Sequence, residues 1–258
     1  MDLKNEIENT QVIIFAGGEG KRMSDSNLPK ALQKVAGKTL IDWCIEFYAK
    51  HGLKKFIILV GYLHEDVENY VGDGSRYGVN VKYSVDPQGV EKIGKGKAFK
   101  HAIQTGKIDL NKRAIIAYPD DIFLDENLPT DLLKKHLEIK DSRSIIATIV
   151  CTSGIEYPYG VVLSYDGNVV DEFFEKPVMQ IPTNTGLFVV EPEVYNMVEE
   201  NVEMESEEAI EFERIVLPKV VKTGKLNRML IPTGTWIPVN TQKELENAER
   251  ILQERNNL

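Results

Sequence analysis

The sequence predicts an α/β protein built on a doubly wound, mostly parallel sheet that becomes mixed in the second half of the chain. Short apolar runs rich in β-branched residues recur at residues 12–16, Lys55–Val60 and 113–118, as expected of strands buried on both faces. Segments with helical periodicity separate these runs, and such alternation is typical of parallel strands joined by helices. From Ser142 onward, strands follow one another with short loops, which favours mixed or antiparallel pairing.

The first half is expected to alternate strictly between strands and helices. Residues 39–51 carry a broad apolar face and end at Gly52, which suits the position just after a helix. The elements that follow are expected to be a strand, a helix, a strand, a helix and a strand, at Lys55–Val60, His64–Val71, 79–85, 95–104 and 113–118. Crossovers in such a sheet are right-handed, so successive loops should lie along one carboxyl edge.

The second half is expected to extend the same sheet. Its predicted strands lie in residues 144–150, 160–164, 169–175 and 185–190, with a turn at Asp166-Gly167-Asn168. The acidic residues 199–213 are interpreted as a solvated helical face rather than a metal site, because charge blocks usually only solubilise. Residues 241–256 are expected to form a last helix, in which Thr241 and Glu244 make a capping box.

Composition limits the classes of function. The chain has 258 residues, 42% of them hydrophobic, and no apolar run approaches the ~20 residues that span a bilayer. The charged N-terminus lacks the apolar core of a signal peptide, and Cys44 and Cys151 are interpreted as reduced core residues of a cytoplasmic protein. A formal charge of −9 argues against nucleic-acid binding. An acidic protein that binds a polyanion must gather positive charge locally or bring in a metal.

A glycine turn follows the first strand, in the segment QVIIFAGGEGKRM at residues 11–23. Glycines here can adopt φ > 0 and leave backbone N–H groups bare, a concavity that favours phosphate oxygens, and basic residues follow. The residues are Gly17, Gly18 and Gly20, with Arg22 and Lys30 after them. A P-loop does not fit, because Arg22 stands where its second glycine would be, and Met23 is too large for a dinucleotide fingerprint. The alternative is an ordinary strand-to-helix turn with solvated basic residues.

Two carboxylates follow the strand expected at residues 113–118. Asp120 and Asp121 would lie at the carboxyl end of a parallel strand, which faces the crevice where ligands bind. Mg²⁺ prefers oxygen ligands, typically one or two carboxylates together with substrate phosphates. Because Pro-Asp-Asp is also common in turns, a plain turn remains the alternative.

Several motifs occur in a recognisable order: AGGEGKRM at 16–23, Pro29-Lys30, Gly37-Lys38, Tyr-Gly-Val at 159–161, Glu-Lys-Pro at 175–177 and Asn-Thr-Gly at 184–186. With them the chain resembles the sugar-1-phosphate nucleotidyltransferases, also called NDP-sugar pyrophosphorylases. The resemblance implies a Rossmann-like fold of the nucleotide-diphospho-sugar transferase type. It also implies a single nucleotidyltransferase domain over residues 1–258, with a nucleotide-binding half at about 8–140 and a sugar-binding half at about 141–258.

The resemblance assigns roles by motif. The catalytic set it implies is Arg22, Lys30, Asp120 and Lys176. The nucleotide-binding set it implies is Ala16, Gly17, Gly18, Gly20, Asp86, Gln88 and Gly96. The sugar-phosphate-binding set it implies is Gly160, Glu175, Lys176 and Asn184. The expected cofactor is Mg²⁺, held by Asp120 and Asn240.

For the second metal ligand and for the base of the nucleotide, the sequence leaves alternatives. Many members of the family carry an aspartate where this chain has Pro238, so Asn240 is expected to offer its carbonyl oxygen instead; the alternative is a turn residue before the last helix. UTP or dTTP is the default nucleotide by resemblance. Asp86, however, suits the donor edges of guanine or cytosine, whereas Gln88 takes the position of the base-contacting residue if the loop is shifted. A plain Asp-Pro loop without a role at the base is the alternative.

The expected reaction is transfer of a nucleotidyl group from an NTP to a sugar 1-phosphate, such as a hexose like glucose, with release of pyrophosphate. The expected partners are these two substrates, without nucleic acid or membrane, and a homo-oligomer is left open. Two alternatives stand beside it. One is a non-catalytic homologue that binds an NDP-sugar as a regulator, and the other is a cytidylyltransferase acting on a non-sugar phosphate such as phosphocholine.

Overall fold

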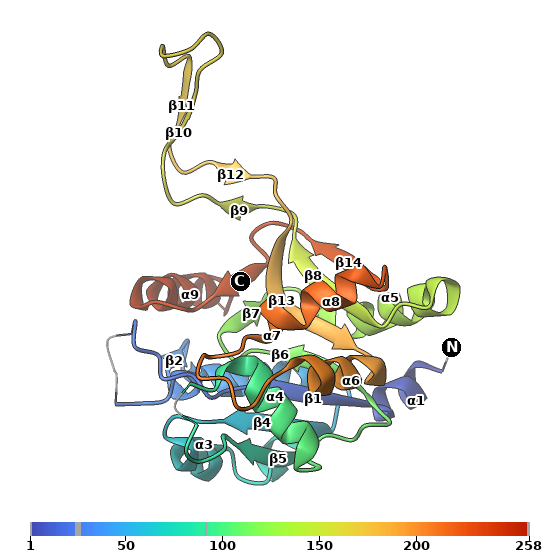
Figure 1. Cartoon of the computed structure of the whole chain (residues 1–258). Coiled ribbons are helices and arrows are strands. Elements are labelled where there is room, and N and C mark those ends of the chain that lie inside the picture. Colours follow the sequence, from blue (N-terminus) through green and yellow to red (C-terminus); the bar gives the residue numbers. More distant parts are fainter. Residues whose placement is uncertain (1, 24–26, 91, 257–258) are drawn as a thin grey trace.

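Helices cover both faces of a central twisted sheet (Figure 1). The computed structural model describes residues 2–23, 27–90 and 92–256. Within these residues the sheet has seven strands in the order β14-β8-β13-β6-β1-β4-β5. Their bounds are β1 (Thr10–Phe15), β4 (Lys55–Val60), β5 (Asn80–Val85), β6 (Arg113–Ala117), β8 (Ala147–Thr152), β13 (Thr183–Val190) and β14 (Leu226–Ile231).

Strand direction shows which strand ends share an edge of the sheet. The pairs β4–β5, β1–β4, β1–β6 and β8–β14 are parallel, whereas β13 runs antiparallel to both β6 and β8. β8 therefore runs in the same direction as β6, and the carboxyl ends of β1, β4, β5, β6 and β8 share one edge. The predicted doubly wound, mostly parallel mixed sheet is confirmed, and β13 is the strand that makes it mixed.

The strands are buried on both faces because each face has its own core. Val12 and Ile14 of β1 pack with the helices of one face, while Ile13 and Phe15 pack with those of the other. The first face carries α2 (Leu40–Ala49), α3 (His64–Val71) and the start of α5 (Leu128–Arg143). The second face carries α4 (Gly94–Gln104), α6 (Pro192–Asn201), α7 (Phe212–Ile215) and α8 (Leu217–Lys222).

Smaller elements complete the body. α1 (Leu3–Glu8) precedes the sheet, and α9 (Gln242–Asn256) packs in a third apolar cluster with β2 (Lys34–Val35) and β15 (Trp236–Pro238). β2 pairs with β3 (Lys38–Thr39), β15 pairs with β7 (Asp121–Phe123), and 3₁₀ turns occur at η1 (Lys30–Leu32) and η2 (Ser75–Tyr77). In the described part of the chain, no helix combines the length and apolar character that crossing a bilayer requires.

The helices differ from the sequence-based expectation in two places. α5 was not predicted, although Leu128, Leu132, Leu133 and Leu137 form its buried stripe and Pro129 occupies its first turn, where proline is tolerated. The interpretation of residues 199–213 as one solvated helix is wrong. α6 ends at Asn201, residues 202–211 follow as an irregular segment, and α7 begins with the buried Phe212.

Residues 153–182, which we call the arm, leave the sheet between β8 and β13 and project from the body (Figure 1). Near the body, β9 (Ile155–Glu156) pairs with β12 (Val178–Met179), and farther out β10 (Val161–Leu163) pairs with β11 (Glu172–Phe174). The expectation that these strands extend the sheet is wrong: of the second half, β8, β13 and β14 join it.

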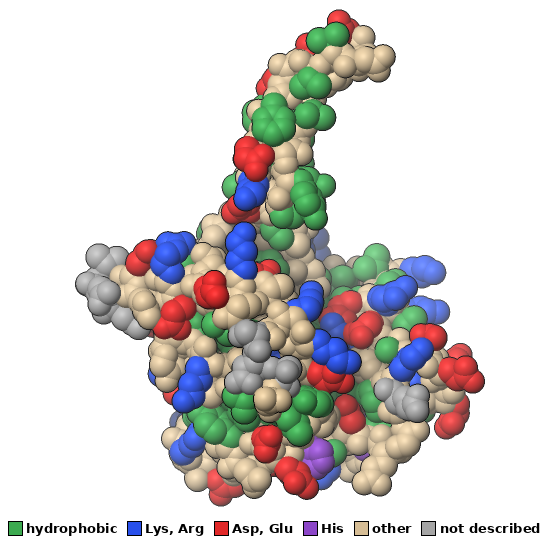
Figure 2. All heavy atoms as spheres, turned by 90° about the vertical axis from the view of Figure 1, so that its left-hand side faces the viewer, with side chains coloured by type: hydrophobic (Ala, Val, Ile, Leu, Met, Phe, Trp, Pro, Cys, Tyr) green, Lys and Arg blue, Asp and Glu red, His purple; other side chains and the backbone are tan. Residues whose placement is uncertain are grey.

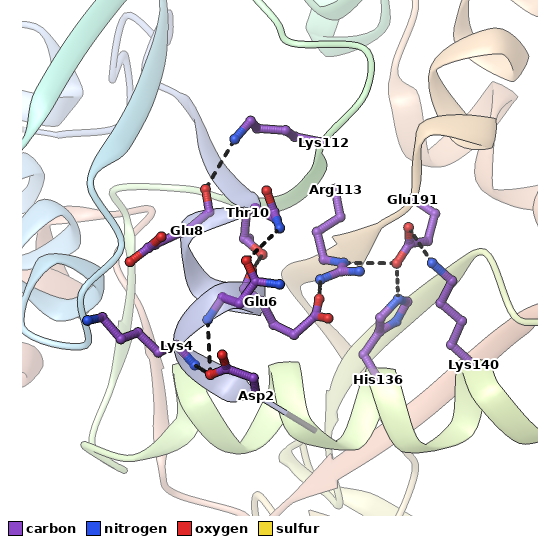
Figure 3. Close-up of polar contacts among 12 residues, drawn as sticks. Asp2, Lys4, Glu6, Glu8, Thr10, Lys112, Arg113, His136, Lys140 and Glu191 are labelled. Atoms are coloured by element: carbon purple, nitrogen blue, oxygen red, sulfur yellow. Dashed lines mark hydrogen bonds and ion pairs between the residues drawn. The ribbon is translucent and has the colours of Figure 1, made fainter.

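A buried ion cluster ties four elements together at the edge opposite the carboxyl ends (Figure 3). Glu191, at the end of β13, accepts hydrogen bonds from Arg113 Nε at 3.0 Å and His136 Nε2 at 2.9 Å, and it pairs with Lys140 Nζ at 2.8 Å. Arg113 also pairs with Glu6 of α1. Burial acts to raise the pKa of Glu191, but the His136 and Lys140 contacts and the Arg113 charge outweigh it and lower that pKa to about 2.

Candidate active site

The glycine turn lies at the carboxyl end of β1. Gly20 has a φ of +71°, and a Cβ there would lie 3.2 Å from Lys30 Cβ, so the turn needs glycine both for its backbone and for close packing. No described residue accepts a hydrogen bond from the backbone N–H groups of Gly17, Gly18 or Glu19. These amides are therefore available to an anion.

A cavity of about 1110 Å³ opens beside this turn. Its wall is drawn from the ends of β1, β4, β5 and β6, the start of α4, α7 with the residue before it, and the residues before α9. Ten of the residues singled out from the sequence line it: Ala16, Gly17, Gly18, Gly20, Arg22, Lys30, Asp86, Gln88, Asp120 and Asn240. Residues separated by more than two hundred positions thus meet at one edge of the sheet.

Lys30, Asp120 and Asn240 form the centre of this wall. The Lys30 ammonium pairs with the Asp120 carboxylate and donates to Asn240 Oδ1 at 2.9 Å. The backbone fixes both oxygen donors: Val239 N–H donates to Asp120 O at 2.8 Å, and Asn240 N–H donates to Glu244 Oε2 at 2.8 Å. Glu244 belongs to the predicted capping box, since its own N–H donates to Thr241 Oγ1 at 3.3 Å.

This donor set fits Mg²⁺. A carboxylate and an amide oxygen converge on one cation, the Lys30 ammonium, so the same two oxygens can share a metal ion together with substrate phosphates. In the described residues, no group of three or more His, Cys, Asp or Glu side chains could hold a metal ion alone. A metal at this site would therefore depend on oxygen atoms from the substrates.

Asp121 points away from this centre. It is the first residue of β7, and its Oδ1 accepts a hydrogen bond from Trp236 Nε1 at 2.8 Å. Burial, followed by the charge of Asp120, raises the pKa of Asp121 well above its ordinary value. The two adjacent carboxyl groups thus have different environments, and Asp120 is the one that lines the cavity.

Asp86 lies directly against the glycine turn. A Cβ on Gly61 would stand 2.2 Å from Asp86 Oδ2, and one on Gly17 would stand 3.5 Å from the same atom. Burial raises the pKa of Asp86 to about 6, and the nearby His64 opposes this shift. No described residue hydrogen-bonds the Asp86 carboxylate, so both oxygens are available to a ligand.

The wall of the cavity also contains a cluster that could not be predicted from the sequence. Lys95 Nζ lies 2.6 Å from Glu213 Oε1 and 3.4 Å from Glu211 Oε2, and it sits 4.9 Å above the Tyr118 ring. Tyr118 donates its hydroxyl hydrogen to Glu213 Oε1 at 2.8 Å. These glutamates belong to the acidic segment that was interpreted as solvated, so part of that segment is cavity wall instead.

Gly96 is not on the cavity wall. Its N–H donates to Ile210 O at 2.6 Å, and a Cβ would lie 2.8 Å from that oxygen, so the acidic segment covers it. Gly94, with a φ of +67°, lines the cavity in its place. The spaced glycines at 94 and 96 were the available signal that another backbone approaches here.

Charge in the described part of the wall is balanced. The five basic residues are Lys21, Arg22, Lys30, Lys95 and Arg214, and the five acidic residues are Glu19, Asp86, Asp120, Glu211 and Glu213. All three of these lysines are paired with carboxylates of the wall. Basic residues in the wall therefore do not outnumber acidic ones. A bound polyanion would need a metal ion to compensate its charge, because the wall has no surplus of positive charge.

Four predicted sugar-phosphate residues are not brought into the cavity. Gly160, Glu175 and Lys176 are on the arm, and Asn184 lies at its root, where Oδ1 accepts the Gly186 N–H at 2.9 Å. Lys176 has a φ of +46°, an uncommon backbone conformation for a residue with a side chain. Their assignment remains a prediction.

The chain is similar to curated proteins that are named as nucleotidyltransferases of sugar 1-phosphates. The chain is 29% identical over 198 residues to a UTP–glucose-1-phosphate uridylyltransferase of Synechocystis sp., which is 73% of this chain and 50% of that protein. It is 29% identical over 247 residues to mannose-1-phosphate guanyltransferase 2 of Candida glabrata, which is 90% of this chain and 62% of that protein. The chain thus spans about half of the first relative and under two thirds of the second.

The fold has a close structural counterpart. A Bacillus anthracis structure, provisionally assigned as a glucose-1-phosphate thymidylyltransferase and solved with sucrose, aligns with a TM-score of 0.71, covers 94% of each chain and is 22% identical. At that identity the likeness establishes the fold alone. A family model described as nucleotidyl transferase matches residues 11–255, nearly the whole chain. By that match, the protein belongs to the nucleotidyl transferase family.

Proposed function

We propose that the protein transfers a nucleotidyl group from a nucleoside triphosphate to a sugar 1-phosphate. The observation that carries the proposal is the convergence of Lys30, Asp120 and Asn240 beside the bare amides of the glycine turn in one cavity. Cations, amides and hard oxygen ligands in one place suit a reaction between two phosphate esters.

The chemistry requires positioning more than proton transfer. A phosphate oxygen of the sugar 1-phosphate attacks the α-phosphorus of the NTP, the bond to the β-phosphate oxygen breaks, and pyrophosphate leaves. The attacking phosphate, with a second pKa near ~6, is already mostly dianionic at neutral pH and needs no general base. The turn amides, Arg22 and Lys30 would hold the triphosphate. Mg²⁺ on Asp120 and Asn240 would supply charge neutralisation between the two reactants.

The position of Asp86 supports GTP as the nucleotide, in place of the UTP or dTTP default. Its free carboxylate offers two acceptor oxygens beside the glycine turn. Guanine presents two adjacent donors, N1–H and N2–H₂, which match a carboxylate pairwise. Uracil and thymine present a single N–H between two carbonyl oxygens, and those oxygens would face a negative charge. Cytosine, with its amino donor, is intermediate.

A pyrophosphate-release assay tests the reaction. Four NTPs are crossed with hexose 1-phosphates in the presence of Mg²⁺, and Asp120→Asn is compared with Asp141→Asn, a surface control on α5. We expect turnover with at least one pair, a loss of at least ~100-fold in Asp120→Asn, and no change in the control. Binding of an NDP-sugar without pyrophosphate release would select the regulatory alternative, and activity with phosphocholine alone would select the non-sugar one.

The same matrix tests the base. We expect GTP to have the highest kcat/KM, and Asp86→Asn to reduce the preference for GTP over UTP by at least ~10-fold, because an amide can donate to a uracil carbonyl. A wild-type preference for UTP or dTTP would restore the default. The hydrophobic environment of the free thiols Cys44 and Cys151 suits a reducing compartment, and we place the reaction in the cytoplasm.

A further inference from the structure

The arm exposes an apolar surface that the body does not cover (Figure 2). Of the seventeen large hydrophobic residues that are exposed in the described part of the chain, twelve are on the arm, with exposed fractions from 36% to 72%. They are Ile155, Tyr157, Tyr159, Val162, Leu163, Tyr165, Val169, Val170, Phe173, Phe174, Val178 and Ile181. Such a concentration on one projecting element marks an interaction surface.

This surface is large enough to hold two molecules together. Allowing ~150–200 Å² for each large side chain and about half of it exposed, the arm presents on the order of 1000 Å² of apolar area. A standard stable interface buries about 800 Å² on each partner. An isolated two-stranded ribbon is at best marginally stable in water, so the arm needs a surface to pack against.

The cavity lacks the residues that the arm carries. Among the described residues, none from the arm lines the cavity, although Glu175 and Lys176 of the Glu-Lys-Pro motif are on the arm. The arm starts at the carboxyl end of β8, on the same sheet edge as the cavity. It therefore projects from the functional edge of the molecule without contributing to its own site.

The root of the arm is held in its projecting direction. Ser153 N–H donates to Ile231 O at 2.9 Å, Ser153 Oγ and Thr233 Oγ1 lie 3.0 Å apart, and Thr233 N–H donates to Ser153 Oγ at 3.1 Å. A Cβ on Gly154 would lie 2.8 Å from Met179 O, so the two strands are in close contact there. These contacts hold the root of the arm in its projecting direction, and packing against a second molecule can leave all of them intact.

We propose that the arm docks on a second copy of this chain, in a symmetric dimer in which each arm delivers Lys176 to the partner's cavity. The arrangement covers the apolar surface of both arms and completes both sites by the same contact, as a two-fold axis requires. The role of Lys176 at the sugar phosphate rests on the proposed function. Dimerisation through the arm does not, so the two can fail separately.

Sedimentation velocity on the full chain tests the surface. The wild type should be a dimer at micromolar concentration, and the double variant Val162→Glu/Phe173→Glu should weaken the dimer at least ~100-fold by placing charges in an apolar contact. The matched control is Leu110→Glu/Val221→Glu, two exposed apolar residues of the body, and it should remain dimeric. A monomeric wild type, or a dimer indifferent to the arm variant, would overturn the proposal.

Subunit mixing tests the shared site. Lys176→Ala, with an intact cavity, is co-expressed with Asp120→Asn, with an intact arm, and pyrophosphate release is measured. Half of randomly paired dimers are hybrids with one complete site of two, so activity should return to about a quarter of wild type. Activity no higher than the sum of the separate variants would show that each arm serves its own cavity. A wild type that dimerises but never turns over would reject the proposed function while leaving the arm contact standing.

Discussion

Asp86 illustrates what a single residue's surroundings add to its identity. Its type and its place after a predicted strand were available from the sequence, but its contact with Gly17 and Gly61 was not. The same holds for Lys95 and Glu213, whose side chains meet across 118 positions in the chain. Local patterns identify strand ends and glycine turns; they carry no information on which distant side chain faces them.

Burial of Asp86 predicts a pH dependence of nucleotide binding. In the proposed contact with the base, the Asp86 carboxylate would have to be ionised to accept two hydrogen bonds, and its pKa is raised to about 6. Above pH 6 the KM for GTP should therefore be constant, and below pH 6 it should rise by about tenfold per pH unit as the protonated fraction grows. Steady-state kinetics from pH 5 to 8 measure this. Asp86→Asn should remove this break, and an unaltered break in that variant would point to another group.

Gly61 offers a second prediction at this scale. Its replacement by alanine would place a Cβ 2.2 Å from Asp86 Oδ2 and 3.2 Å from Gly17 O, so the carboxylate must move. Gly61→Ala should raise the KM for the preferred NTP at least ~10-fold, with a smaller effect on kcat, because it disturbs binding and leaves Asp120 in place. Gly106→Ala is the control: a Cβ there meets nothing, and the strain at its φ of +67° lies outside the cavity wall. Equal kinetics in the two variants would count against Asp86 as a base contact.

Among the elements, β13 depends on an irregularity. Between Asn184 and Phe188 its pairing with β8 shifts register, and Gly186 has a φ of +84° with Asp121 and the Tyr118 ring directly above it. Asn-Thr-Gly stands out in the sequence as a motif, whereas the bulge cannot be predicted from it, because period-two alternation does not reveal a register shift. α5 was not predicted either, although its leucine stripe is regular and a proline in the first turn is compatible with a helix.

Gly186→Ala should destabilise the protein. The Cβ would lie 2.7 Å from both Asp121 Oδ2 and Tyr118 Cδ2, in addition to the unfavourable φ, so we expect a loss of about 2–4 kcal/mol in the free energy of unfolding. Urea denaturation measures it. Gly224→Ala, also at positive φ but with open space around it, should lose about 1 kcal/mol. Similar losses in both variants would show that backbone strain alone matters.

The ion cluster around Glu191 joins α1, α5, β6 and β13. The pKa of Glu191 is about 2, against 4.5 ordinarily. The stabilisation by the ionised carboxylate is therefore fully present above pH 4.5 and is lost as pH falls toward 2. The shift corresponds to roughly 3 kcal/mol, at about 1.4 kcal/mol per pKa unit. Glu191→Gln should lose at least that at pH 7 and show less further loss at pH 3, by urea denaturation. Glu200→Gln, exposed on α6, should follow the wild type at both pH values.

For the whole molecule, the fold class could be predicted from the sequence because strand–helix alternation admits few topologies. The projection of the arm could not, since its strands have the same residue pattern as strands that join a sheet. The net charge of the whole protein also bears on ligand binding. The protein carries a formal −9, and the described cavity wall has as many acidic as basic residues.

A divalent ion should therefore be indispensable for binding the triphosphate. We expect EDTA to abolish pyrophosphate release and Mg²⁺ to restore it, with NTP affinity by calorimetry at least ~10-fold weaker without the metal. Asn240→Asp, which adds a negative oxygen ligand, should lower the Mg²⁺ concentration needed for half-maximal rate. Full NTP affinity in EDTA would mean that the protein's own amides and cations suffice.

β13 enters the middle of the sheet, between β6 and β8, although the ribosome makes it after the arm. The nascent chain must therefore leave a slot open and carry the arm outside while that slot waits for its strand. For the sheet, the arm is a loop that connects β8 to β13, and each doubling of the length of such a loop adds only about 0.6 kcal/mol to the entropic cost of closing it. A longer or shorter arm would therefore cost the central sheet little stability.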